Sequence, residues 1–134
     1  MMWIEKTSFY RATILYTPNF GLQYVVGAIR NNVFKWDLSS VRLIYNGAEP
    51  IIDSITKAFL AALKPYKLSD SAMYPVYGMA EATVGISLPD PGDPYTTHII
   101  RRDQLKVGCR VEYSDYDDQN VIAFVEVGRP LPSC

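Results

Sequence analysis

Apolar residues in the first part of the chain are arranged in two different patterns. Short compact runs, rich in β-branched and aromatic residues, occupy residues 12–16, 41–46 and 73–79, and each ends at a threonine–proline or glycine turn. Runs of this length and composition predict buried strands. We therefore expect three strands in this part of the chain, the last of which runs into a glycine turn.

Between these runs, apolar residues recur every three or four positions, which predicts helices. We expect one helix at residues 2–10, a second from Pro18 to the asparagines at 31–32, and a third over residues 51–64. In the third helix the spacing places Ile52 on the face toward the core and Asp53 on the opposite face. Alternation of strand and helix predicts an α/β fold with a partly parallel sheet and covering helices.

The pattern changes at the sequence PDPGDP, residues 89–94, whose prolines and glycine exclude regular structure. Beyond it the apolar period is two, which predicts strands at residues 95–100, 109–113 and 121–127. A polar turn joins the last two, so we expect them to form a hairpin. The chain thus divides into an α/β segment, residues 1–88, and a second segment that is rich in β-strands, residues 89–134.

Composition limits the classes of function. Hydrophobic residues make up 49% of the 134 positions, which supports one packed domain. Thirteen basic and fourteen acidic residues are scattered without a basic run, so we do not expect a nucleic-acid partner. No apolar stretch approaches the roughly 20 residues of a spanning helix and no signal pattern opens the chain, so we expect no membrane partner and a cytoplasmic location.

Two turns carry the residues best suited to chemistry: YNGAEP at residues 45–50 and YGMAEAT at residues 77–83. Both follow predicted strands, and ligands of open α/β sheets bind at the carboxyl ends of strands. Tyr77 offers an aromatic face for a base, and Glu81 offers the hard carboxylate oxygen that Mg²⁺ prefers. The same turns also fit a non-catalytic α/β interaction domain, whose glycines serve only the fold.

Four motifs occur in a fixed order along the chain: TPNF, NGAEP, YGMAEAT and VGRPLP. Their order and spacing resemble the adenylate-forming (AMP-binding) superfamily, and the combination looks most like the fatty acyl-AMP ligases. Many relatives carry threonine where this chain has Ala80, and alanine is typical of the fatty acyl-AMP ligases. The resemblance covers nearly the whole chain and implies that it is an internal part of the large N-terminal domain of a ligase.

The resemblance implies a site for ATP or AMP at the two turns, with Tyr77 stacked on or beside the purine. The residues implied in nucleotide binding are Asn46, Gly47, Ala48, Glu49, Tyr77, Gly78, Met79 and Ala80. Glu81 is implied as the catalytic residue that holds Mg²⁺ against the phosphates, and such a metal neutralises charge as pyrophosphate leaves.

The resemblance also implies a fatty acid or other carboxylate as substrate, with Asn19, Phe20 and Tyr24 in the wall of the acyl pocket. The acceptor would be an acyl carrier protein or CoA. An acyl-CoA synthetase and the amino-acid adenylation module of a peptide synthetase are the alternatives within the superfamily. Residues 101–120 fall where fatty acyl-AMP ligases carry an extra segment that is thought to restrain the mobile C-terminal domain.

Several parts that adenylation needs are absent from the sequence. It contains no phosphate-gripping glycine-rich loop, no TGD-like motif, and no lysine in a fitting context. In the superfamily these parts lie before and after the matching span, so we expect an excerpt of a longer enzyme that has no adenylation activity alone. A parallel sheet without its outer strands exposes unpaired edges, and we expect these edges to favour self-association.

Overall fold

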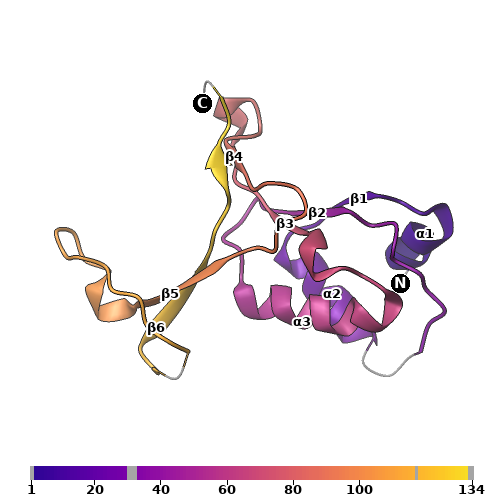
Figure 1. Ribbon diagram of the computed structural model, residues 1–134, viewed down its shortest axis with the longest axis horizontal. Coiled ribbons are helices and arrows are strands. Elements are labelled where there is room, and N and C mark those ends of the chain that lie inside the picture. The colour runs from indigo at the N-terminus through magenta and orange to yellow at the C-terminus, as the bar shows by residue number, and fades with distance from the viewer. Residues whose placement is uncertain (1, 30–32, 117, 133–134) are drawn as a thin grey trace.

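The computed structural model describes residues 2–29, 33–116 and 118–132 (Figure 1). Its α-helices are α1 (Met2–Tyr10), α2 (Asn19–Ile29) and α3 (Asp53–Leu63). Its strands are β1 (Ile14–Tyr16), β2 (Leu43–Asn46), β3 (Met73–Pro75), β4 (Ser87–Leu88), β5 (Thr97–Arg101), β6 (Val121–Val125) and β7 (Arg129–Pro130). Short 3₁₀ turns complete it: η1 (Lys64–Tyr66), η2 (Asp70–Ala72), η3 (Ala80–Ala82) and η4 (Arg102–Gln104).

The α/β body is a three-stranded parallel sheet in the order β1-β2-β3. Helices α2 and α3 lie together on one side of it (Figure 1). Leu22 of α2 and Phe59 of α3 pack with Ile44 of the central strand, and all three are completely buried. Burial of such side chains is worth about 1.5–3 kcal/mol each. The predicted parallel sheet with covering helices is therefore confirmed, with each strand shorter than predicted by two to four residues at one end.

The start of α3 differs from the expectation. Ile52 is the N-cap residue and is 47% exposed, whereas Asp53 in the first turn is only 4% exposed. The predicted orientation of these two side chains is thus wrong. Spacing along a helix favours isoleucine over aspartate for the core, but the partners that satisfy the buried carboxylate lie far away in the sequence. The predicted end of the second helix, at residues 31–32, lies outside the described residues.

Strands β5 and β6 pair in antiparallel register from Thr97–Val125 to Arg101–Val121 and project from the body (Figure 1). We call β5, β6 and the segment that joins them the extension. The predicted strand at residues 109–113 is wrong, because only Tyr113 forms a single bridge, to Ile100. The predicted hairpin between that strand and residues 121–127 is therefore also wrong. Residues 109–113 are all exposed, so no core face stabilises their alternating pattern as a strand.

Across the described ranges, no helix has the length and apolar character needed to span a lipid bilayer. Cys109 is an exposed free thiol, and Cys134 lies outside the described residues.

Candidate functional site

Two bends lie side by side where β2 and β3 end. We call residues 46–50 the Asn46 bend and residues 77–83 the Tyr77 bend. The Val76 amide donates a 2.8 Å hydrogen bond to the carbonyl oxygen of Asn46, and a β-carbon on Gly47 would lie 2.8 Å from the Val76 carbonyl oxygen. Adjacent parallel strands present their carboxyl ends at one edge, which brings the bends together as the sequence predicts.

Strained backbone occurs in and directly after these two bends. Ala48 has φ 70°, and the consecutive residues Thr83 and Val84 have φ 55° and 78°. The left-handed region costs an L-residue roughly 1–2 kcal/mol, and β-branched residues are rare there. A β-carbon on Gly78 would overlap with the carbonyl oxygen of Val84, so the Tyr77 bend closes tightly on itself. Strain of this kind persists where the surrounding structure holds it, often at ligand sites.

Asn19 fixes the Asn46 bend to the start of α2. Its side-chain amide donates to the Pro50 carbonyl oxygen at 2.8 Å, and its Oδ1 accepts from the Ile52 amide at 3.1 Å. Its backbone amide donates to Oε1 of Glu49 at 2.7 Å. Asn19 is buried, and its partners are Glu49 and Pro50 of the bend and Ile52 two positions after it. The residue therefore sets the shape of the bend.

A cavity of about 860 Å³ lies between the two bends, the first turn of α3 and strand β6. We call it the β6 cavity. Ala48, Glu49, Tyr77 and Gly78 line it from the bends, and residues 121–125 line it from β6. Its volume falls within the roughly 300–1,000 Å³ range of small-molecule sites.

A second cavity, of about 510 Å³, lies on the other side of the bends, toward β1 and the start of α2. We call it the β1 cavity. Tyr16 and Tyr45 line it, and their rings stack with centroids 4.8 Å apart. The bends contribute a further set of lining residues: Gly47, Ala48, Gly78, Met79 and Ala80. Ala48 and Gly78 line both cavities, so the bends form a narrow partition between them.

Asn46 and Glu81 line neither cavity. The Asn46 side chain is completely buried, and neither of its polar atoms has a hydrogen-bond partner within the described part of the chain. Glu81 lies exposed on η3. In the same described part, no three His, Cys, Asp or Glu side chains are grouped to hold a metal.

The predicted acyl-pocket residues also line neither cavity. Asn19 belongs to the hydrogen-bond network of the Asn46 bend, and Phe20 and Tyr24 are 72% and 68% exposed on α2. Thr17 and Pro18, which directly precede Asn19, line the β1 cavity. Contact of the three residues with an acyl chain stays a prediction.

The buried carboxylate of Asp53 is the feature that sequence reasoning missed. Burial alone would raise the pKa of Asp53, but hydrogen bonds from Tyr116, Lys57 and Thr97 outweigh it and lower the pKa below its usual value. Burial, and then the negative charge of Asp53, raise the pKa of Tyr95 to about 12. An acidic residue in the first turn of a predicted helix was the available signal, but it is equally typical of a solvent-exposed position.

Comparison with known proteins identifies the segment. No protein-family model matches the chain. It is 32% identical over 131 residues to the medium-chain-fatty-acid–[acyl-carrier-protein] ligase JamA of Moorena producens, a match that covers 96% of the chain and 22% of JamA. The chain therefore spans about a fifth of the length of this relative.

Solved structures are also similar to this chain over nearly its whole length. The fatty acyl-adenylate ligase of L. pneumophila, in complex with acyl adenylate and pyrophosphate, superposes with a TM-score of 0.88 and 35% identity over 96% of this chain and 23% of the ligase. The adenylation domain of a keto acid-selecting NRPS module, bound to keto acyl adenylate, superposes with a TM-score of 0.84 and 25% identity over 98% of this chain and 25% of that domain.

Proposed function

Because this chain belongs to the adenylate-forming superfamily and corresponds to a segment of the fatty acyl-AMP ligases, we propose that its parent protein activates a fatty acid with ATP. The product is an acyl-adenylate, and pyrophosphate is released. The acyl group then passes to a thiol acceptor, either an acyl carrier protein or CoA. The described segment contributes one side of the adenylate site.

The observation that carries this proposal is the partition formed by the two bends. An acyl-adenylate has a purine nucleoside at one end and an acyl chain at the other, joined through one phosphate. Two cavities that share Ala48 and Gly78 as a common wall suit such a molecule, with the phosphate at the partition. Tyr77 lines the β6 cavity and offers an aromatic face, which supports placing the purine on that side. The acyl chain would then lie in the β1 cavity, where the rings of Tyr16 and Tyr45 offer apolar surface.

Magnesium belongs to the same proposal. Mg²⁺ keeps several waters and binds through one or two carboxylates together with substrate phosphates. Glu81 is a single exposed carboxylate that follows Met79 and Ala80, residues that line the β1 cavity beside the partition. One carboxylate in this position fits the usual donor set. Glu81 would hold the ion, which supplies positive charge against the phosphates.

The isolated chain is expected to bind an adenylate without turning it over. It spans about a fifth of JamA, and no lysine or acidic ribose-binding motif of the expected kind occurs in its sequence. Acyl-dependent exchange of pyrophosphate into ATP by the isolated chain would contradict this expectation.

Calorimetry with an acyl sulfamoyl adenosine, a stable analogue of an acyl-adenylate, tests the proposal on this chain. Loss of a base–aromatic stack is worth about 1–3 kcal/mol, so Tyr77→Ala should weaken binding about tenfold or more. Glu81→Ala should leave the affinity for the analogue unchanged, because the analogue carries no triphosphate, but should abolish the effect of Mg²⁺ on ATP binding. Tyr113→Ala is the matched control, since Tyr113 is an exposed tyrosine that lines neither cavity.

Equal affinity of the wild type and the Tyr77→Ala variant would remove the purine from the β6 cavity. An absence of heat in every variant would favour a non-catalytic interaction domain. Competition for binding between a fatty acyl and a keto acyl analogue tests which of these two acid classes the chain prefers. The structural neighbours include a protein of each class, so the fold alone does not distinguish them.

Self-association is a further part of the proposal. In the described sheet, β1 and β3 each pair with β2 only, so each has one unpaired edge. Unpaired edges of this kind template pairing with another chain. Sizing chromatography should show an oligomer whose share rises with concentration, and a strict monomer at all concentrations would count against it.

A further inference from the structure

The carboxylate of Asp53 gathers donors from two distant parts of the chain. Its Oδ2 accepts a hydrogen bond from the Tyr116 hydroxyl at 2.6 Å and forms an ion pair with the Lys57 ammonium at 2.9 Å. Its Oδ1 accepts from the Thr97 hydroxyl at 2.7 Å and from the Tyr95 hydroxyl at 3.3 Å. Four donors thus occupy the roughly four lone-pair sites of one ionised carboxylate.

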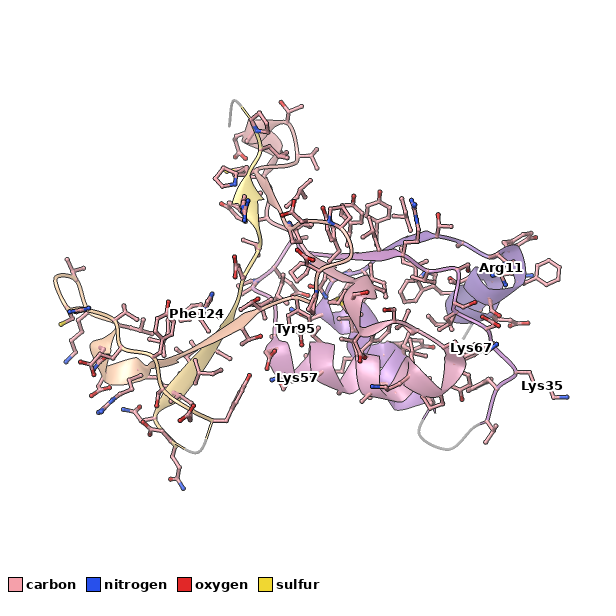
Figure 2. The ribbon with its side chains drawn as sticks, viewed as in Figure 1. Arg11, Lys35, Lys57, Lys67, Tyr95 and Phe124 are labelled. Carbon is pink, nitrogen blue, oxygen red and sulfur yellow. The ribbon has the colours of Figure 1, made fainter. Side chains whose placement is uncertain are left out.

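Three of these donors belong to the extension or its root, whereas Asp53 and Lys57 belong to α3. Thr97 opens β5 and Tyr95 lies two positions before it, while Tyr116 lies in the segment that leads to β6. In Figure 2, Lys57 lies at the end of α3 that faces the extension, and Tyr95 lies where the extension leaves the body. One side chain therefore joins the two parts of the molecule.

Tyr116 contacts both Lys57 and Asp53. The Lys57 ammonium donates to the Tyr116 hydroxyl at 2.8 Å and also lies 4.3 Å from the centre of the Tyr116 ring. Tyr116 in turn donates to Asp53, so the three side chains form a closed ring of contacts. A satisfied buried charge rigidifies its surroundings, and removal of one partner leaves a costly unpaired group.

This group is part of the β6 cavity. Asp53 and Tyr116 line the cavity together with residues 121–125 of β6 and the two bends. Strand β6 contacts the body at α3. The position of the cavity wall therefore depends on the same hydrogen bonds that hold the extension.

We infer that Asp53 is a positioning residue, which holds the extension against α3 through Tyr95, Thr97 and Tyr116 and thereby keeps β6 in place as a wall of the β6 cavity. The inference concerns the arrangement of the chain itself. It does not rest on the proposed function, and its test needs no ligand.

A distance measurement between spin labels on α3 and on the extension tests the inference in the full chain. Labels are placed on Ala61→Cys and Arg101→Cys, both exposed positions, with Cys109 and Cys134 changed to serine. At pH 7 we expect a narrow distance distribution. Asp53→Asn and Tyr116→Phe should each broaden it and move it to longer distances, whereas Tyr113→Phe, an exposed tyrosine of the same segment, should not.

The pH profile separates positioning from a general loss of structure. Lys57, Tyr95 and Tyr116 are the titratable groups that face Asp53, and only the carboxylate titrates in acid. The distribution should broaden as the pH falls through the lowered pKa of Asp53, and should not change in Asp53→Asn. His98 and Glu126, which pair on the extension, are present in both proteins and act as an internal control.

Narrow distributions in both Asp53→Asn and Tyr116→Phe would overturn the inference. A broad distribution in Asp53→Asn alone would also overturn it, because Tyr116 would then have no holding role. If Asp53→Asn fails to fold, Tyr116→Phe and Thr97→Val carry the test, since each removes one hydroxyl and leaves the carboxylate ionised. A shift in the wild type at low pH that is matched by Asp53→Asn would assign the change to acidic groups other than Asp53 and contradict the inference.

Discussion

Gly78 lies against the backbone of Val84, so closely that a β-carbon on the glycine would overlap with the Val84 carbonyl oxygen. This contact closes the Tyr77 bend and places Met79 and Ala80 at the edge of the β1 cavity. The neighbouring atom is backbone and cannot rotate away. The bend therefore tolerates no side chain at position 78.

Substitution of two glycines should have opposite effects on stability. Gly78→Ala should lower the free energy of unfolding by at least about 1–3 kcal/mol, because the bend must distort to admit a β-carbon. Gly27→Ala, in α2, should raise it by about 1 kcal/mol, because alanine favours the helix and no other atom lies within 4 Å of the new carbon. Urea titrations of both variants make the comparison. Equal effects would show that the close approach at Gly78 is absent in solution.

Val84 should be better replaced by glycine. Its φ of 78° is unfavourable for a β-branched residue, and its side chain is 78% exposed, so little packing is lost on removal. We expect Val84→Gly to raise the free energy of unfolding by up to about 1 kcal/mol. Glycine relieves the strain of the positive φ, and this gain exceeds the larger backbone entropy that glycine loses on folding. Thermal unfolding provides the measurement. Val33→Gly, at a fully exposed position without positive φ, is the control and should give no gain.

Two buried asparagines should respond differently to the same substitution. Asn46 has no partner for its side chain among the described residues, whereas Asn19 bonds Pro50 and Ile52. Asn46→Leu should therefore raise the free energy of unfolding by about 1 kcal/mol, and Asn19→Leu should lower it by about 1–3 kcal/mol or more. Chemical denaturation of both variants measures the difference. A loss of stability in Asn46→Leu would indicate a partner for this amide and would contradict the prediction.

Asp53 should make the stability of the chain depend on pH. Its pKa is lower in the folded state, so its contribution is complete above the ordinary carboxyl pKa and is lost as the pH falls through the lowered folded value. Asp37 and Asp103 also have lowered pKa values and add to the acid dependence. The relevant quantity is thus the difference in the free energy of unfolding between the wild type and Asp53→Asn. That difference should shrink as the pH falls, and a difference that stays constant would contradict this prediction.

The local sequence determined most of the α/β body. Period and composition predict β1 to β3 and the helices, because steric preferences of proline, glycine and β-branched residues act over a few positions. They also predict that Gly47 and Gly78 lie at one edge, since parallel neighbouring strands end together. The motifs NGAEP and YGMAEAT were sufficient to indicate the family. For the strands, helices and bends, the deciding interactions lie within one element or between strands that follow each other in the sheet.

Only the tertiary structure decided the burial of Asp53, the pairing of β5 with β6, and the two cavities. Tyr95, Thr97 and Tyr116 lie 42, 44 and 63 positions from Asp53, so no local pattern could reveal that a polar residue would be the buried one. The alternating pattern at residues 109–113 favours a strand by itself, yet no other element offers it a face to cover. Burial is a property of what surrounds a side chain, and those surroundings are assembled only when distant segments meet.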